Sequence, residues 1–261
     1  MKIYTFGNEN KPVMMLLPGT CCHYRTFEGV IDLLQESFYV VSVSYDGFDE
    51  KEDTVFPGMI EETEKIENYI QETFNGKIFA AYGCSLGGSF VGLLIQRKKI
   101  HIDHGFIGSS DLDQTSKLIA KIQSAMVVPM FYKMLVNGKL PKAFSKMIDH
   151  SDPEEKQYIT DFLRFFGIGE KAMDMSFVKR ESVYNQFYTD LITPLDKKIE
   201  VENTTIHVFY ALKMGKKYEK RYLLHFKDPD IRRHDLQHEQ LLIGKPDLWI
   251  KEIRACCFKG E

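Results

Sequence analysis

The chain has 261 residues, which is longer than one typical domain of about 100–200 residues and too short for two full-sized domains with a linker. We therefore expect one large domain that carries an insertion. Hydrophobic residues make up 44% of the chain and charged residues 27%, close to soluble globular proteins, which excludes a disordered, collagen-like or disulfide-stapled chain. The 34 basic and 37 acidic side chains leave a formal charge of -3. The basic excess that gathers phosphate backbones is missing, so nucleic acid is not expected as a partner.

Apolar runs and cysteines indicate the compartment. The N-terminal stretch MKIYTFGNENKPVMMLLPG has only short apolar runs, and the chain nowhere has the run of about 18 apolar residues typical of a membrane span. We therefore expect neither a signal peptide nor a membrane span. Five cysteines with two adjacent pairs, Cys21/Cys22 and Cys256/Cys257, make a poor disulfide framework and suit a reducing, cytoplasmic environment. No C-x-x-C spacing occurs, so no metal site is expected.

Up to about residue 110, short β-rich runs alternate with stretches of helical period. Residues 13–17, 38–45, 77–82 and 102–107 are apolar runs typical of strands that are buried on both faces. Between the second and third, residues 59–70 carry one apolar stripe among glutamates, which predicts an amphipathic helix. Residues 87–97 are apolar on most sides and predict a buried helix. This order predicts an α/β fold with a mostly parallel, doubly wound sheet.

From residue 112 to residue 202 the pattern becomes helical, with little β-branched alternation, and is cut by Pro129 and later prolines and glycines. Within it, the sequence Ser-Asp-Pro-Glu at 151–154 has the residues of a helix start, and that helix should continue to Phe165. Several methionines and aromatic residues could roof an apolar site or form the core of the insertion itself: Met126, Met130, Phe131, Met134, Phe162, Phe165 and Phe166.

The β signal returns at residue 204, followed by a basic helical stretch, a short strand near 231–236 and a last helix near 246–256. We therefore expect a core of residues 1–111 and 203–261 around an all-helical insertion of residues 112–202. The basic stretch could steer an anionic substrate or simply form a solvated helix face: Lys213, Lys216, Lys217, Lys220 and Arg221.

The motif that indicates chemistry is Gly83-Cys84-Ser85-Leu86-Gly87, a match to G-x-S-x-G between a predicted strand and a predicted helix. A serine on such a tight turn needs small flanking residues, because the turn strains the backbone and brings strand and helix close together. The turn also directs the hydroxyl towards the helix N-terminus, where free N–H groups favour an oxyanion. The alternative is a glycine-rich turn in which the serine is incidental.

With this motif the sequence resembles the α/β-hydrolase fold superfamily, in particular its serine hydrolases and esterases with a helical cap. YGCSLGG stands in the place of the nucleophile elbow, LLPGT in that of the oxyanion loop and HEQLL in that of the terminal histidine. The resemblance covers nearly the whole chain, and residues 112–202 lie where that superfamily inserts its variable cap.

The resemblance implies an oxyanion hole formed by two backbone N–H groups, those of Leu86 and Thr20. The superfamily commonly has His-Gly in the turn before the second donor, whereas this chain has Pro18-Gly19. The glycine that permits the bend is kept. The alternative is that this segment is only a turn that ends a strand.

A serine needs a base within hydrogen-bond reach, normally a histidine held by a carboxylate. Of the eight histidines, those in or beside predicted strands, in the insertion or on a predicted helix are set aside, and His234 and His238 remain. Both lie near the segment before the last helix, where the superfamily's chain order of serine, acid and histidine places the base. We prefer His238, which follows the last predicted strand, and keep His234 as the second choice. The alternative for His238 is a solvated residue at a helix start.

The acid is the open position of the predicted triad. Most members of the superfamily carry it after the first strand that follows the cap, where this chain has lysines and only Glu219 nearby. Some members carry it after the strand that follows the nucleophile helix, where this chain has Asp111 and Asp113 at a sheet edge typical of ligand sites. We prefer Asp111, followed by Asp113 and then by Asp235. The alternative is that Asp111 and Asp113 cap the first helix of the insertion.

These observations predict a serine hydrolase that cleaves a small-molecule carboxylic ester or thioester with an apolar acyl group and that needs no cofactor. The missing acid after the post-cap strand favours an alternative, a non-catalytic binding or scaffold protein that has kept the fold. A further alternative is carbon–carbon bond hydrolysis or acyl transfer with the same triad.

Overall fold

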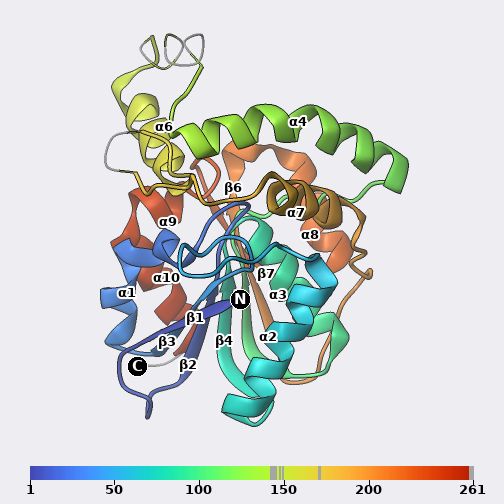
Figure 1. Cartoon of the computed structure of the whole chain (residues 1–261). Helices are drawn as coiled ribbons and strands as arrows, with labels where there is room; N and C mark the ends of the chain where they lie inside the picture. Colours follow the sequence, from blue (N-terminus) through green and yellow to red (C-terminus); the bar gives the residue numbers. More distant parts are fainter. Residues whose placement is uncertain (142–145, 147, 149, 170–171, 259–261) are drawn as a thin grey trace.

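The computed structural model describes residues 1–141, 146, 148, 150–169 and 172–258. Its centre is a seven-stranded sheet with the order β1-β3-β2-β4-β5-β6-β7 (Figure 1). All neighbouring strands pair in parallel except β1 and β3, which are antiparallel. The strands are β1 (Lys2–Phe6), β2 (Val13–Leu17), β3 (Tyr39–Ser44), β4 (Lys77–Gly83), β5 (His101–Ile107), β6 (Thr205–Ala211) and β7 (Asp230–His234).

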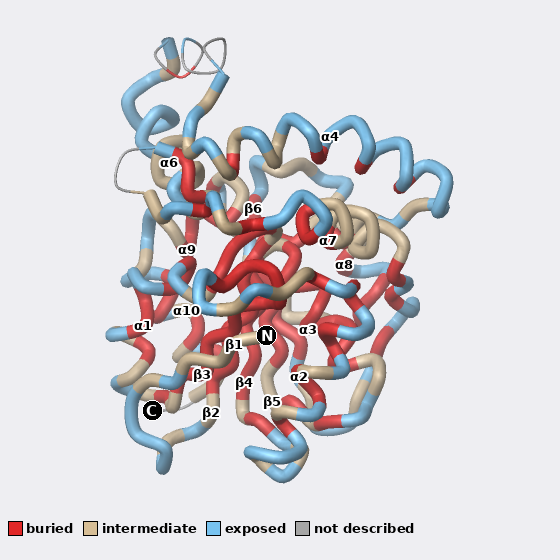
Figure 2. The backbone as a smooth tube through the Cα atoms, in the orientation of Figure 1, coloured by how far each residue is buried: buried red, intermediate tan, exposed pale blue. Residues whose placement is uncertain are grey.

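Helices cover both faces of the sheet. Successive side chains of a strand point to opposite faces, so each face presents apolar side chains that a layer of helices buries. In β2, Met15 and Leu17 join the cluster that includes α2 (Met59–Phe74) and α3 (Leu86–Arg97). Met14 and Leu16 join the cluster on the opposite face, with α1 (Glu28–Gln35) and α10 (Pro246–Cys257). Figure 2 shows the resulting buried core along the strands. The remaining elements of the core are η1 (Tyr24–Phe27), η2 (Leu212–Met214), α8 (Lys216–His225) and α9 (Gln240–Gly244).

Three helices of the predicted insertion lie above the carboxyl ends of the parallel strands (Figure 1): α4 (Lys117–Asn137), α6 (Pro153–Phe165) and α7 (Arg180–Ile192). Helix α7 packs against α4 and α2, and α6 packs against α9. Hydrogen bonds also join α7 to the loop after β3 and to the start of α2: the N–H of Phe56 donates to Ser182 Oγ (3.2 Å) and that of Met59 to Thr189 Oγ1 (3.2 Å). These helices are therefore attached directly to the core.

The predicted α/β fold with its parallel sheet is confirmed, and the predicted strands and core helices appear within a few residues of their expected bounds. The elements that the sequence analysis did not predict include the antiparallel edge strand β1, the helix α1 and the short helix α9. The expectation that Pro129 interrupts the helical pattern was wrong, because α4 continues through it. Asp152 caps α6 as predicted, accepting from the N–H groups of Glu154 and Glu155.

Candidate active site

Ser85 lies in a sharp turn between β4 and α3. Its backbone angles, φ 48° and ψ -112°, are a strained combination for a residue with a side chain. Two hydrogen bonds hold the turn: the N–H of Gly87 donates to Cys84 O (2.7 Å), and that of Cys84 to Leu17 O (3.0 Å). The turn therefore places Ser85 at the carboxyl edge of the sheet, at the amino end of α3.

The two glycines of G-x-S-x-G are required because a side chain at either position would overlap neighbouring backbone atoms. A Cβ atom on Gly83 would lie 2.1 Å from the carbonyl carbon of Gly87, and one on Gly87 would lie 2.1 Å from Leu17 O. Both neighbours are backbone atoms that cannot rotate away. Strand β4, helix α3 and strand β2 therefore approach one another closely only because these positions lack side chains.

We expect Gly87→Ala to destabilise the protein strongly, because the new methyl group must displace the backbone of β2. Its unfolding free energy should fall by at least about 3 kcal/mol. Gly29→Ala is the matched control, because Gly29 lies in α1 and a methyl group added there would meet nothing within 4 Å. That variant should be unchanged or stabilised by about 0.5–1 kcal/mol. Urea unfolding measures both, and equal stabilities would contradict the close approach at Gly87.

His238 meets Ser85 from the loop between β7 and α9. Its Nε2 lies 3.2 Å from Ser85 Oγ, although the two residues are 153 positions apart in the chain. Helix α6 contacts this histidine: Tyr158 Oη donates to His238 O (3.0 Å), and the Phe162 ring meets the imidazole edge to face. His234, the second choice, lies at the end of β7 with its ring against Phe209. The structure thus brings His238 to Ser85.

The four candidate acids differ in position. Asp111 follows β5, and burial and the neighbouring charge of Asp113 raise the pKa of its carboxyl, against a smaller opposing effect of His238. Asp113 forms an ion pair with Arg221. Asp235 is exposed, and Glu219 binds Arg233 Nε at 3.0 Å. Within the described residues no carboxylate is hydrogen-bonded to Nδ1 of His238, and Asp111 is the candidate whose charge acts on that ring.

Neither Asp111 nor Asp113 caps the first helix of the insertion, so that alternative was wrong. The N-cap of α4 is Ser116, whose side chain accepts from the N–H of Ile119. The loop that carries Asp111 is held in other ways: Arg221 donates to Asp111 O (2.8 Å), and Tyr222 Oη donates to Ser110 O (2.6 Å). The backbone around Asp111 is therefore fixed by α8.

Glu239, which the sequence had not singled out, lies at the centre of the site. It is buried, has a left-handed backbone (φ 55°) and directly follows His238. One carboxyl oxygen accepts from the N–H of Ser85 (2.8 Å) and the other from Tyr82 Oη (3.1 Å). This side chain therefore joins the histidine loop to the turn that carries Ser85. Only its place next to a candidate histidine could have drawn attention to it.

The two predicted oxyanion donors lie next to Ser85. Leu86 is the first residue of α3, and Thr20 follows Gly19, where an added Cβ atom would lie 3.5 Å from Ser85 Cβ. In the part of the chain that the structure describes, neither N–H donates to a protein acceptor. Both therefore remain free to bind a ligand oxygen.

A buried glutamine holds the loop that carries Thr20. The N–H of Cys21, which has a left-handed backbone (φ 55°), donates to Oε1 of Gln186 on α7 (2.6 Å). Gln186 Nε2 is buried and has no partner among the described residues. Helix α7 thus helps to shape the predicted oxyanion hole, a role that no local sequence pattern indicates.

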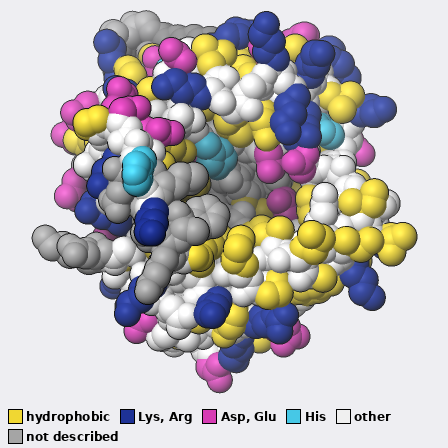
Figure 3. Space-filling model, turned by 90° about the horizontal axis from the view of Figure 1, so that it is seen from above, with side chains coloured by type: hydrophobic (Ala, Val, Ile, Leu, Met, Phe, Trp, Pro, Cys, Tyr) yellow, Lys and Arg dark blue, Asp and Glu magenta, His cyan; other side chains and the backbone are white. Residues whose placement is uncertain are grey.

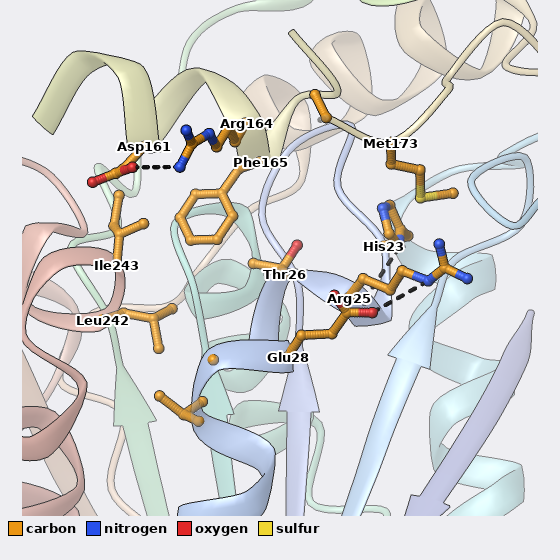
Figure 4. Close-up of a pocket in the computed structure, with 13 residues that line it drawn as sticks. His23, Arg25, Thr26, Glu28, Asp161, Arg164, Phe165, Met173, Leu242 and Ile243 are labelled. Atoms are coloured by element: carbon orange, nitrogen blue, oxygen red, sulfur yellow. Dashed lines mark hydrogen bonds and ion pairs between the residues drawn. The ribbon is translucent and has the colours of Figure 1, made fainter. Parts of the chain in front are cut away.

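A cavity of about 550 Å³ lies between η1, α6 and α9, next to the oxyanion loop (Figure 4). Its charged side chains are neutralised locally: Arg25 pairs with Glu28 (3.3 Å), and Arg164 with Asp161 (3.0 Å). Ser85 does not line it. The cavity therefore lies beside the candidate catalytic pair rather than around it.

His23 lines this cavity, and its buried side chain should make the stability of the protein depend on pH. Burial and, to a smaller extent, the charge of Arg25 lower the pKa of His23 to about 4, against about 6.5 in an unfolded chain. Between these values the unfolded chain binds a proton that the folded chain does not, so stability is lost as the pH falls. The loss from this residue should approach about 3 kcal/mol by pH ~4.

The matched variant is His23→Asn, because asparagine can still accept the hydrogen bond that Nδ1 of His23 takes from the N–H of Arg25 but does not titrate. Denaturant unfolding at several pH values should show a shallower decline for this variant than for the wild type. Parallel curves would contradict the assignment of a neutral, buried His23.

One further cluster has side chains that metals favour. The ligand atoms of His207, Asp230 and Cys256 all lie within 4.8 Å of one another. Both ring nitrogens of His207 already have partners, Asp230 Oδ2 at 3.0 Å and His104 at 3.2 Å. The cluster is therefore explained by hydrogen bonding within the sheet and is separate from Ser85.

Neither a family model nor a curated protein sequence matches this chain. Solved structures do match, over nearly the full length of both chains. A Desulfitobacterium hafniense protein assigned to the alpha/beta hydrolase family has a TM-score of 0.75 at 14% identity, covering 98% of this chain and 99% of that one. The enol-lactonase from Burkholderia xenovorans LB400 has a TM-score of 0.69 at 13% identity (97% and 94% covered). The type II thioesterase BorB from the borrelidin biosynthetic cluster has 0.66 at 13% identity (98% and 97% covered).

Proposed function

The chain has the α/β-hydrolase fold, and from this premise we propose that it is a serine hydrolase that cleaves a carboxylic ester or thioester. The observation that carries the proposal is the 3.2 Å contact between Ser85 Oγ and His238 Nε2, with Ser85 on a strained turn at a helix N-terminus. A fold alone does not establish an activity, so the proposal depends on this local geometry.

Ser85 would attack the acyl carbon while His238 Nε2 accepts the hydroxyl proton. The N–H groups of Thr20 and Leu86 would stabilise the oxyanion of the tetrahedral intermediate. His238 then donates the proton to the alcohol or thiol as that group departs. The acyl group remains bound to Ser85 as an acyl-enzyme. Water, deprotonated by His238, releases the carboxylic acid and restores Ser85. Each step uses only side chains and N–H groups of this chain.

Asp111 is our proposed acid. Its charge would favour the imidazolium that forms at His238, which is the electrostatic role of the third residue of a triad. Burial and the charge of Asp113 raise the pKa of Asp111, whereas His238 acts in the opposite direction, so a positive charge on His238 favours the ionised form of Asp111.

Two observations support an ester or thioester with an apolar acyl group as the substrate. The Phe162 ring lies against His238, and it contacts Phe166, which contacts Phe131 in turn. This gives an aromatic wall from the imidazole into the insertion. The similar structures include proteins named as an esterase, an enol-lactonase and a thioesterase.

Covalent labelling tests the proposal directly. A fluorophosphonate should label the wild type, because only a serine activated by a base reacts readily with it, and the Ser85→Ala variant should remain unlabelled. Asp111→Asn should slow labelling, whereas Asp113→Asn should change it less, since Asp113 is engaged by Arg221. Labelling that persists without Ser85 would refute the assignment, and an unlabelled but folded wild type would favour a binding protein.

A further inference from the structure

Helix α4 exposes a large apolar surface. Of the eleven large hydrophobic side chains that are exposed in the described part of the chain, six lie on this helix. Met126 is 74% exposed, Leu118 69% and Ile122 53%. Leu118, Ile122, Met126 and Met130 are four residues apart, so they form one row along the helix. Figure 3 shows hydrophobic side chains gathered in a band on this end of the molecule.

The row is not an extension of the core. The buried residues of α4 lie on the opposite side of the helix, which packs against α7: Ala120, Ser124, Val128 and Leu135. Apolar residues thus lie on opposite sides of the helix, although only one side has a partner. Figure 2 shows its other side exposed. Contiguous exposed apolar surface of this kind marks an interaction site in soluble proteins.

The position of this row argues against a role as the roof of the acyl site. Met126 and Met130, which the sequence left open as roof or core, are both exposed, so they are not part of the core, and neither lines the cavity of about 550 Å³. Phe131, by contrast, points inward and contacts Phe166 and Phe187. One side of α4 therefore packs within the protein, and the other side is exposed and available to a binding partner.

The charged residues on α4 itself are all positive. Helix α4 contains Lys117, Lys121 and Lys133 and no acidic residue, and Lys139 follows it. All four are exposed, and none forms an ion pair with the described residues. Further exposed lysines follow the carboxyl end of β6, at the sheet edge that α4 covers: Lys213, Lys216, Lys217 and Lys220. Exposed lysines at an apolar surface attract anionic lipid headgroups.

We propose that the outer side of α4 docks on an anionic lipid surface. The apolar row would enter the boundary between headgroups and acyl chains while the lysines contact the headgroup phosphates and carboxylates. A second copy of this chain fits less well, because a symmetric contact would oppose lysine to lysine. By length and composition α4 could also span a bilayer, but its packing on α7 favours docking over spanning. This docking does not depend on the proposed catalysis, and it would turn the carboxyl edge that carries Ser85 towards the membrane.

Vesicle flotation of the full chain tests the proposal. The wild type should float with vesicles that contain phosphatidylserine and bind more weakly to pure phosphatidylcholine or at raised salt. The Ile122→Ser/Met126→Ser variant should lose at least roughly tenfold in binding, because it removes the centre of the row. The Ile60→Ser and Leu248→Ser variants, which change exposed apolar residues of α2 and α10, should bind as the wild type does. The Lys121→Gln/Lys133→Gln variant should lose the preference for anionic vesicles.

A fluorescence measurement gives an independent readout. The only tryptophan, Trp249, is fully buried, so a Met126→Trp variant adds one exposed reporter. Its emission should shift to the blue on anionic vesicles, whereas that of the Ile60→Trp variant should not. A wild type that stays in solution with both kinds of vesicle would overturn the proposal. So would a wild-type dimer that Ile122→Ser/Met126→Ser converts to a monomer, because the occupant would then be a second copy.

Discussion

The Ser85→Ala variant is expected to lose roughly 10⁴–10⁶-fold in kcat on any ester that the wild type hydrolyses. His238→Ala should lose nearly as much, because the 3.2 Å contact makes the histidine the only base at the Ser85 hydroxyl among the described residues. The double variant should be no slower than the slower single variant. Residues that act as one unit fail together, whereas independent contributions would multiply.

Steady-state kinetics on a chromogenic ester measure all three variants. Ser110→Ala is the matched control, since Ser110 lies at the same sheet edge, next to Gly88, and its buried hydroxyl has no partner in the described residues. That variant should keep nearly the wild-type kcat. A double variant much slower than either single variant would show that Ser85 and His238 do not act as a pair.

The second large effect is expected at Glu239. Glu239→Ala leaves the N–H of Ser85 and the hydroxyl of Tyr82 without their acceptor and releases the histidine loop from the turn. The unfolding free energy should fall by about 2–4 kcal/mol. The kcat should fall by roughly 10²-fold with little change in KM, because a displacement of about 1 Å between Ser85 and His238 slows the chemistry more than binding.

Glu239→Gln distinguishes positioning from simple stability. Its amide oxygen can still accept from Ser85, so it should restore part of the kcat that the alanine variant loses. Tyr82→Phe is the control for the second hydrogen bond and should lower stability by about 1 kcal/mol or more while the Ser85 contact remains. If Glu239→Ala keeps the full kcat at temperatures where it is folded, Glu239 does not position the pair.

Much of the fold was predictable because its determinants are local. Runs such as residues 13–17 are apolar at every position, which requires burial on both faces of a sheet, and β2 shows both faces buried. The N-cap Asp152 and the turn at Gly83–Gly87 likewise depend on neighbours a few residues away. β1 was not expected because none of its residues is fully buried, so it lacks the continuous apolar run of an inner strand such as β2. Pro129 was misjudged because a proline can lie within a helix when packing holds both halves.

The candidate site was predictable only in part. Ser85 could be predicted from the G-x-S-x-G motif around it, and the chain order of the α/β-hydrolase superfamily directed attention to His238. The contacts of Asp111, Glu239 and Gln186 could not be predicted, because each joins segments more than about a hundred residues apart and no periodicity encodes such a meeting.

By itself, the sequence determined the parallel sheet, the glycines of the turn and the identity of the serine, since backbone sterics and side-chain alternation decide these within a few residues. The tertiary structure alone decided which histidine reaches that serine, which carboxyl group accepts from its N–H and which side of α4 is exposed. The last case shows the physical reason most clearly. Helix α4 has apolar residues on opposite sides and therefore no apolar stripe that selects an inner side, so only the position of α7 determines which of them are buried and which remain exposed.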